Sequence, residues 1–327
     1  MLYGSNSDGV LTQWSMSSDG TLVGNQTFGT DYTVDLFQPI TIGPSGEAYI
    51  SLDQLLVAYP RCSGGVDLEV VETPIIYRGD GHVAVVGNAS FVQVYAISSN
   101  HTVDVYSRTT SGTWQGPSAV MEGSDLPTAG SALAAVPLPG TSDVAVFTLD
   151  TTHHLQAVVG SGETWSQQQQ GIGSSVSTTA YSLTATVNAN DYGRTRLFVV
   201  NSSKDLIMLT WNFYTNIVTT TVFPDQHGSM SRSGQIFTTV SNNMTYVFAI
   251  GNTNVLYVAT VDDEGVTSGP TQISTAGDGY GTYEPPAFVG NTPDQLPYYF
   301  FISNQLKLVK FWFDGIDTWH NTTIVAI

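Results

Sequence analysis

The most constraining feature of the sequence is an internal repeat of about fifty residues. Strand-like aromatic positions recur along the whole chain at intervals of 46 to 52 residues, at Tyr3, Tyr49, Tyr95, Phe147, Phe198, Phe248 and Tyr299. Each unit holds an apolar run, a loop, two alternating strands joined by a short polar turn, and a fourth strand. Four short strands per unit at this period are typical of a β-propeller, in which each unit forms one blade.

The number of units predicts seven blades in a single all-β domain that spans residues 1–327. The first unit shows no innermost strand before Met1, so an alternative arrangement lets the first hairpin complete the last blade and gives six blades. We favour seven. The innermost strands of the other blades are predicted in small and β-branched runs that begin at Ile40, Val83, Ala132, Ser182, Ile236 and Pro286.

The charge composition excludes several classes of partner. The chain has 9 Lys and Arg against 27 Asp and Glu, a formal net charge of −18. A nucleic-acid groove needs clustered basic residues that displace counterions from phosphate, and no such cluster is present. An anionic membrane surface would repel the chain, and no run approaches the ~20 apolar residues of a membrane span. We therefore expect no nucleic-acid partner, no membrane insertion, and ligands with little or no charge.

Six N-x-S/T sequons suggest passage through a secretory pathway. They lie at Asn25, Asn88, Asn100, Asn201, Asn243 and Asn321. Cys62 is the single cysteine, so no disulfide can form within the chain. The first ten residues contain no apolar leader, so we expect a trimmed mature boundary there. We expect a secreted monomer or weak oligomer that carries N-glycans.

Motifs of nucleophilic, metal-dependent or phosphate-binding enzymes are absent from the sequence. There is no G-x-S-x-G elbow, no H-E-x-x-H, and no glycine-rich phosphate loop. His153 and His154 are adjacent, and neighbours on an extended strand point to opposite faces, so they do not predict a shared metal. We expect neither a metal nor a cofactor.

The blade pattern resembles that of the fungal fucose-specific lectins, which are propellers that bind sugar between blades. Their blades carry an Arg on the second strand, an acid or Gln on the third, and a Trp or Tyr beyond. In this sequence the acid position holds Gln13, Val57, Val105, Ala157, Met208, Val258 and Leu308. The Arg position holds Met1, Glu47, Gln93, Ala145, Arg196, Tyr246 and Tyr298.

No unit has the full lectin set. Arg196 is paired with Met208 in its own blade, where the resemblance implies an acid. This substitution predicts that the scaffold is kept while apolar residues replace the repeated sugar site. Under the lectin alternative, sugar binding would rest on one unusual site around Gln13 and Trp14.

Small ligands of propellers commonly bind at the mouth of the central channel. Residues that enter the innermost strands, together with the turns between second and third strands, are expected to form this mouth. The predicted set is aromatic and neutral-polar, and comprises Phe37, Gln38, His82, Tyr181, His227, Arg232, Gln235, Tyr283 and Glu284. It could hold an apolar molecule and hydrogen-bond one oxygenated end.

The whole chain also resembles the hetero-Diels–Alderases of fungal tropolone–sesquiterpenoid biosynthesis. That resemblance implies cofactor-free cycloaddition of an ortho-quinone methide with a humulene-type alkene, which requires only a pocket that orients both partners. Arg232, His82 or Tyr181 would donate to the oxygenated ring. His82, His227 or Glu284 would act as acid or base. Phe37, Gln38, Gln235 and Tyr283 would line the pocket.

Three functions are therefore weighed from the sequence. The leading expectation is the pericyclic enzyme, whose partners are small apolar substrates with an oxygenated ring. The alternative is a fucose-type or other carbohydrate-binding lectin with altered sites. The third is a structural or unrelated binding propeller.

Overall fold

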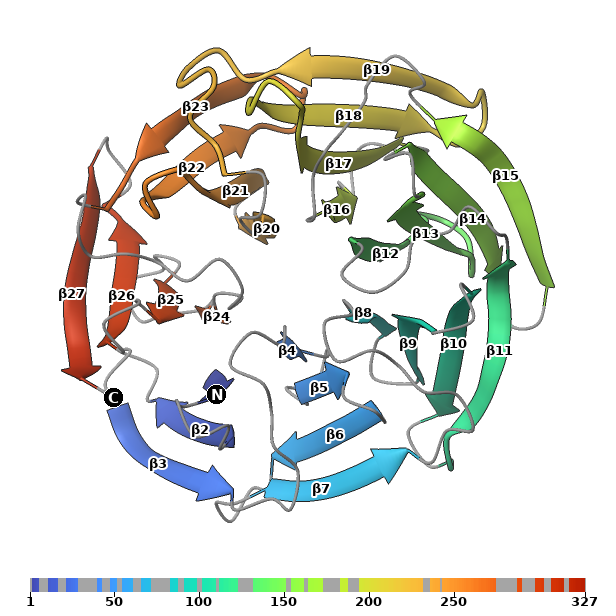
Figure 1. Ribbon diagram of the computed structural model, residues 1–327, viewed down its shortest axis with the longest axis horizontal. Coiled ribbons are helices and arrows are strands. Elements are labelled where there is room, and N and C mark those ends of the chain that lie inside the picture. Colours follow the sequence, from blue (N-terminus) through green and yellow to red (C-terminus); the bar gives the residue numbers. More distant parts are fainter. Residues whose placement is uncertain are drawn as a thin grey trace.

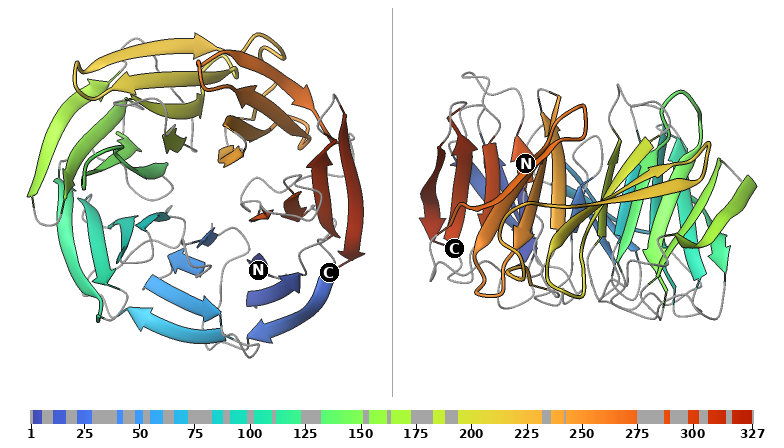
Figure 2. Two further views of the ribbon diagram at one scale, coloured as in Figure 1. Left: turned by 180° about the vertical axis from the view of Figure 1, so that it is seen from behind. Right: turned by 90° about the horizontal axis from the view of Figure 1, so that it is seen from above.

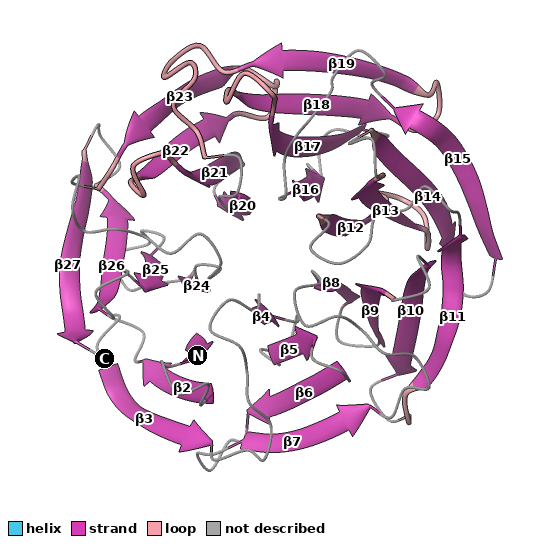
Figure 3. Ribbon diagram, in the orientation of Figure 1, coloured by secondary structure: helices cyan, strands magenta, loops and turns pink. Residues whose placement is uncertain are grey.

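The computed structural model describes residues 2–5, 11–16, 22–28, 40–42, 48–51, 55–60, 66–71, 83–87, 91–98, 102–109, 112–122, 132–150, 154–161, 164–172, 183–187, 194–231, 236–241, 243–274, 287–289, 298–302, 307–314 and 318–326. Side chains are described for fewer of these residues, all from Val83 onward. Within this part of the chain every regular element is a strand (Figure 3). No helix long and apolar enough to cross a membrane occurs among the described residues.

The described strands form seven antiparallel sheets around one centre (Figure 1). The first sheet has three described strands, β1 (Leu2–Ser5), β2 (Leu11–Met16) and β3 (Leu22–Phe28). The second has β4 (Ile40–Ile42), β5 (Ala48–Ser51), β6 (Leu55–Pro60) and β7 (Val66–Val71). The third has β8 (Val83–Gly87), β9 (Phe91–Ile97), β10 (Thr102–Thr109) and β11 (Gln115–Glu122).

The remaining four sheets repeat the four-stranded plan. They comprise β12 (Leu133–Pro137), β13 (Val144–Leu149), β14 (Leu155–Ser161) and β15 (Thr164–Ile172); β16 (Leu183–Val187), β17 (Arg194–Val200), β18 (Leu206–Asn212) and β19 (Ile217–Val222); β20 (Ile236–Ser241), β21 (Met244–Ile250), β22 (Leu256–Val261) and β23 (Thr267–Gln272); and β24 (Ala287–Val289), β25 (Tyr298–Ile302), β26 (Lys307–Phe313) and β27 (Trp319–Ala326). The all-β propeller expectation is confirmed, and the sheets number seven, as favoured from the sequence.

In each four-stranded sheet the strands follow chain order from the centre outward (Figures 1 and 2). The small and β-branched runs predicted as innermost strands are β4, β8, β12, β16, β20 and β24. Short innermost strands suit the crowded centre, where the sheets converge.

The hydrophobic core lies between neighbouring sheets. Because alternate residues of a strand point to opposite faces, each middle strand packs apolar side chains against both neighbouring blades. One cluster joins Phe198 and Met208 of the β16–β19 sheet to Val247, Tyr257 and other residues of the β20–β23 sheet. Equivalent clusters lie at the interfaces on either side of the β12–β15 sheet and between the two last sheets.

The hairpins between second and third strands close in the same way in four successive blades. In each, the first residue of the turn donates its N–H to the carbonyl four residues later, with N···O distances of 2.8 to 3.0 Å. The pairs are Ser98–Thr102, Asp150–His154, Asn201–Asp205 and Gly251–Val255. This shared turn keeps the strand registers of these blades equivalent, so positions can be compared from blade to blade.

Candidate functional site

The strand registers define two cross-strand rows in each blade, on the face toward the next blade. We call the inner one the acid row and the outer one the arginine row, after the lectin residues that the resemblance places there. In the acid row the second and third strands pair Tyr95 with Val105, Phe147 with Ala157, Phe198 with Met208, and Phe248 with Val258. In the arginine row they pair Gln93 with Ser107, Ala145 with Val159, Arg196 with Thr210, and Tyr246 with Thr260.

The acid row is apolar and closed in these four blades. Val105 is 4%, Ala157 0%, Met208 3% and Val258 3% exposed. Each belongs to a hydrophobic cluster between two sheets. The expectation that apolar residues replace the lectin acid is therefore confirmed at these positions, and the thioether of Met208 is part of the core.

The last blade differs from the prediction at its acid row. There β25 and β26 pair Phe300 with Lys310 and Tyr298 with Trp312, which makes Lys310, and not Leu308, the equivalent of Val258. The error arises in the run "YYFFI", where Tyr299 was taken as the repeating aromatic. Tyr299 is buried against Phe248 of the preceding blade, so the equivalent position is its neighbour Phe300.

Arg196 is locked between two blades. Its side chain is 2% exposed, and its two guanidinium nitrogens donate to main-chain carbonyls of the next blade, Nη1 to Asp262 at 2.7 Å and Nη2 to Asp263 at 2.8 Å. These carbonyls belong to the hairpin between β22 and β23. The guanidinium therefore satisfies main-chain acceptors and stabilises the interface, where the resemblance implied a grip on sugar.

The interface between the β8–β11 and β12–β15 sheets places polar groups beside a half-buried indole. The arginine row of the first sheet is Gln93, Ser107 and Gln115, of which the first two are half-buried and the third is exposed. The Tyr95 hydroxyl donates to Gln93 Oε1 at 3.0 Å. Trp165, from the outer strand of the next sheet, packs edge-on against the Tyr95 ring with centroids 5.9 Å apart.

The interface between the two last sheets repeats this arrangement. Its arginine row is Tyr246, Thr260 and Ser268. Trp319 of the outer strand β27 packs edge-on against Tyr246, with centroids 6.1 Å apart, and is half-buried. Burial raises the pKa of the Tyr246 phenol, which stays protonated and able to donate at neutral pH.

The interface between the β12–β15 and β16–β19 sheets lacks these polar groups. Ala145 and Val159 occupy the arginine row and are buried. Trp211 is fully buried there, edge-on to Phe147 with centroids 5.5 Å apart, and its indole N–H donates to Asn216 at 3.0 Å. This interface is a packed core and offers no group to a ligand.

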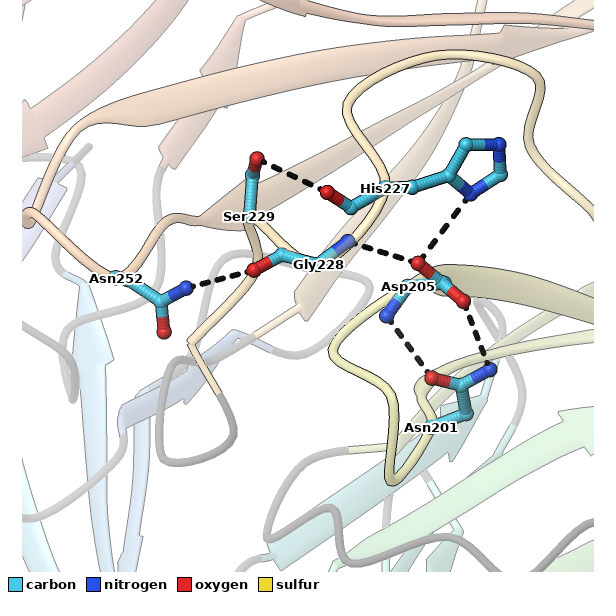
Figure 4. Close-up of polar contacts among 6 residues, drawn as sticks. All are labelled: Asn201, Asp205, His227, Gly228, Ser229 and Asn252. Atoms are coloured by element: carbon cyan, nitrogen blue, oxygen red, sulfur yellow. Dashed lines mark hydrogen bonds and ion pairs between the residues drawn. The ribbon is translucent and has the colours of Figure 1, made fainter.

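A second polar cluster holds the connector between β19 and β20 (Figure 4). Asp205 Oδ1 accepts the Gly228 N–H at 2.8 Å and lies 3.3 Å from Nδ1 of His227, which has 60% of its side chain exposed. Asn252, from the hairpin of the next blade, donates its side-chain amide to the Gly228 carbonyl at 3.0 Å. The connector is thus clamped between the hairpins of two blades.

This clamp confirms one geometric expectation, because it brings a connector residue, His227, against a turn between second and third strands. His227 as an acid or base remains a prediction. The other channel-mouth residues lie outside the described residues, namely Phe37, Gln38, His82, Tyr181, Arg232, Gln235, Tyr283 and Glu284. No group of three His, Cys, Asp or Glu side chains able to hold a metal occurs among the described residues.

Comparison with solved structures decides the fold. The BP39L lectin from Burkholderia pseudomallei superposes with a TM-score of 0.74 at 16% identity, over 97% of this chain and 96% of that one. The chain has the fold of the lectin propellers. No protein family and no curated protein sequence matches it.

Two further lectins share this propeller fold. The Aleuria aurantia lectin in complex with alpha-methyl-L-fucoside matches with a TM-score of 0.59 at 16% identity, over 88% of this chain and 95% of that one. AofleA from Arthrobotrys oligospora matches with a TM-score of 0.55 at 13% identity, over 89% of this chain and 86% of that one. The Aleuria aurantia lectin is described as a six-bladed propeller, whereas the described strands here form seven sheets.

The sequence analysis missed the half-buried indoles as site residues. Trp165 and Trp319 each follow a threonine at the start of the fourth strand of a blade, and Trp114 does the same. This recurring Thr-Trp step was noticed as a strand boundary. Its position against the arginine row of the preceding blade becomes visible only when the sheets are placed side by side.

Proposed function

We propose that this protein is a carbohydrate-binding propeller of the lectin type. The observation that carries the proposal is the repeated pairing of a half-buried indole with the polar arginine row of the preceding blade, at Trp165 and at Trp319. The proteins that share the fold over most of their length, BP39L and the Aleuria aurantia lectin, give it support.

The chemistry of these two interfaces suits a neutral sugar. A pyranose presents apolar C–H faces to aromatic rings and hydroxyls to a few placed polar groups. Gln93 accepts the Tyr95 hydroxyl through Oε1, which leaves its side-chain amide N–H groups to donate. Tyr246 supplies a protonated phenol at the second interface. A net charge of −18 also favours neutral ligands over anions in solution.

The cycloaddition hypothesis draws no support from the solved structures or from the described residues. Of its nine site residues only His227 is described, and it is engaged in the clamp with Asp205. The lectin alternative is therefore the better-supported function, with its sites at the Trp165 and Trp319 interfaces in place of Gln13 and Trp14.

Titration with α-methyl-L-fucoside and a panel of neutral methyl glycosides tests the proposal. We expect Gln93→Leu to weaken binding at the Trp165 interface by about tenfold, because one hydrogen bond to a sugar hydroxyl is lost. Trp165→Ala should reduce the calorimetric stoichiometry by one site. The matched control is Gln272→Leu, since Gln272 is an exposed glutamine of β23 outside both interfaces. A folded wild-type chain that binds no glycoside of the panel would refute the proposed function.

We also infer that the chain is secreted and glycosylated, and the described sequons differ in accessibility. Asn243 and Asn321 are exposed. Asn201 accepts the Asp205 N–H through Oδ1 at 2.9 Å, and its Nδ2 lies 3.4 Å from Asp205 Oδ2. After expression in a eukaryotic secretory host, peptide mass spectrometry should find glycan at Asn243 and Asn321 and little at Asn201. Full occupancy of Asn201 alone would contradict this order.

A further inference from the structure

The face of the last blade toward the first carries a cationic and aromatic cluster that no other described interface has. Val309 and Phe311 of β26 pack against the preceding blade. Lys310 and Trp312 alternate with them and therefore point the other way, toward the first sheet, which is the neighbour on that side (Figures 1 and 2). We call Lys310, Trp312, Asp314 and His320 the Lys310 cluster.

The cluster is ordered by contacts within its own sheet. Lys310 Nζ lies 5.1 Å from the centroid of the Trp312 ring. The imidazole of His320 stacks on Trp312, with centroids 5.4 Å apart and planes at 23°. His320 Nε2 lies 3.4 Å from Asp314 Oδ2, and Asp314 Oδ1 accepts the Thr318 N–H at 3.1 Å. The Asp314 carboxylate is thus occupied by its own hairpin and by His320.

Lys310 places a positive charge where the other described blades have buried apolar side chains. It stands in the acid row, equivalent to Val258, and is half-buried. His320 has 44% of its side chain exposed, so the stacked rings reach solvent. An acid at this position would accept hydrogen bonds from sugar hydroxyls, whereas an ammonium donates and attracts an anion. The position has the opposite charge preference.

We propose that the Lys310 cluster binds a saccharide that carries a carboxylate, such as a hexuronic acid. Lys310 pairs with the carboxylate, and the exposed imidazole, backed by the indole, contacts the sugar ring. This proposal rests on the carbohydrate-binding function and names a second ligand class for it. It departs from the expectation of uncharged ligands because the charge acts locally, since salt screens the rest of the acidic surface beyond about 8–10 Å.

A pair of ligands that differ only at C6 tests the proposal. We would titrate the full chain with methyl β-glucuronide and methyl β-glucoside and compare the two affinities. We expect the glucuronide to bind about tenfold more tightly, the size of one charge-assisted hydrogen bond. The preference should shrink as salt is raised. It should disappear in Lys310→Gln, persist in Lys310→Arg, and be unchanged in Lys204→Gln, a control on a different blade.

The outcomes separate this proposal from the general one. If Lys310→Gln retains the full preference, or the wild-type chain has none while neutral glycosides still bind, the Lys310 cluster only covers Trp312 and the inference fails alone. If no saccharide binds, both fail. A folded Lys310→Gln variant is identified by unchanged binding at the Trp165 interface.

Discussion

Replacing Arg196 by alanine is expected to lower the free energy of unfolding by about 2–4 kcal/mol. The guanidinium is buried and donates to the Asp262 and Asp263 carbonyls of the next blade. The alanine variant removes both donors and leaves a cavity at the interface. The hairpin between β22 and β23 then loses its attachment to the neighbouring blade.

Equilibrium denaturation with urea measures this change. The control is Arg194→Ala, two residues earlier on the same strand, because Arg194 is exposed and should cost less than about 0.5 kcal/mol. Arg196→Lys should fall between the two, since one ammonium cannot span two carbonyls with the fork geometry of a guanidinium. A free energy of unfolding equal to that of the wild type would show that the carbonyls find water in place of Arg196.

Restoring an acid at the lectin position by Met208→Glu is expected to destabilise the fold by about 3 kcal/mol or more at neutral pH. Met208 lies in the cluster between two sheets and is 3% exposed. The nearest basic side chain in the rows, Arg196, is already engaged by main-chain carbonyls. The introduced carboxylate would therefore be buried without its expected partner.

The pH dependence of this variant gives an independent check. Burial raises the pKa of the introduced carboxyl above its unfolded value of about 4.3. The folded state then binds the proton more tightly, so the destabilisation grows as pH rises from the unfolded pKa to the raised folded pKa. Met208→Leu, which keeps the volume, should cost less than about 1.5 kcal/mol at any pH. A glutamate variant as stable as the leucine variant at pH 7 would mean that Arg196 exchanges the carbonyls for the carboxylate.

The fold could be predicted from the sequence because the repeat is written in residue types that strand alternation requires. The aromatics from Tyr95 to Phe248 fall at equivalent register positions in four blades. The prediction slipped by one residue only in the last blade, where three aromatics and one tyrosine stand in a row. Alternation was uninformative there, and only packing of Tyr299 against Phe248 fixes which residues face each neighbour.

The site could not be predicted to the same extent. The partners of Arg196 are main-chain carbonyls, which have no signature in the sequence. The Trp165 interface joins residues about seventy positions apart, whose proximity depends on how two sheets stack. Lys310 was missed because the alignment assigned its position to Leu308. His227 was found, but its contact with Asp205 required the path of the connector.

The hairpins between second and third strands have a consequence for how this propeller can change. All four described hairpins close with one main-chain hydrogen bond, although their end residues are as different as Ser98 with Thr102 and Gly251 with Val255. Because closure does not depend on side-chain identity, substitutions can accumulate at these turns without shifting the strands behind them. One side of the ring is thus free to diversify blade by blade, while the interfaces between sheets hold the scaffold constant.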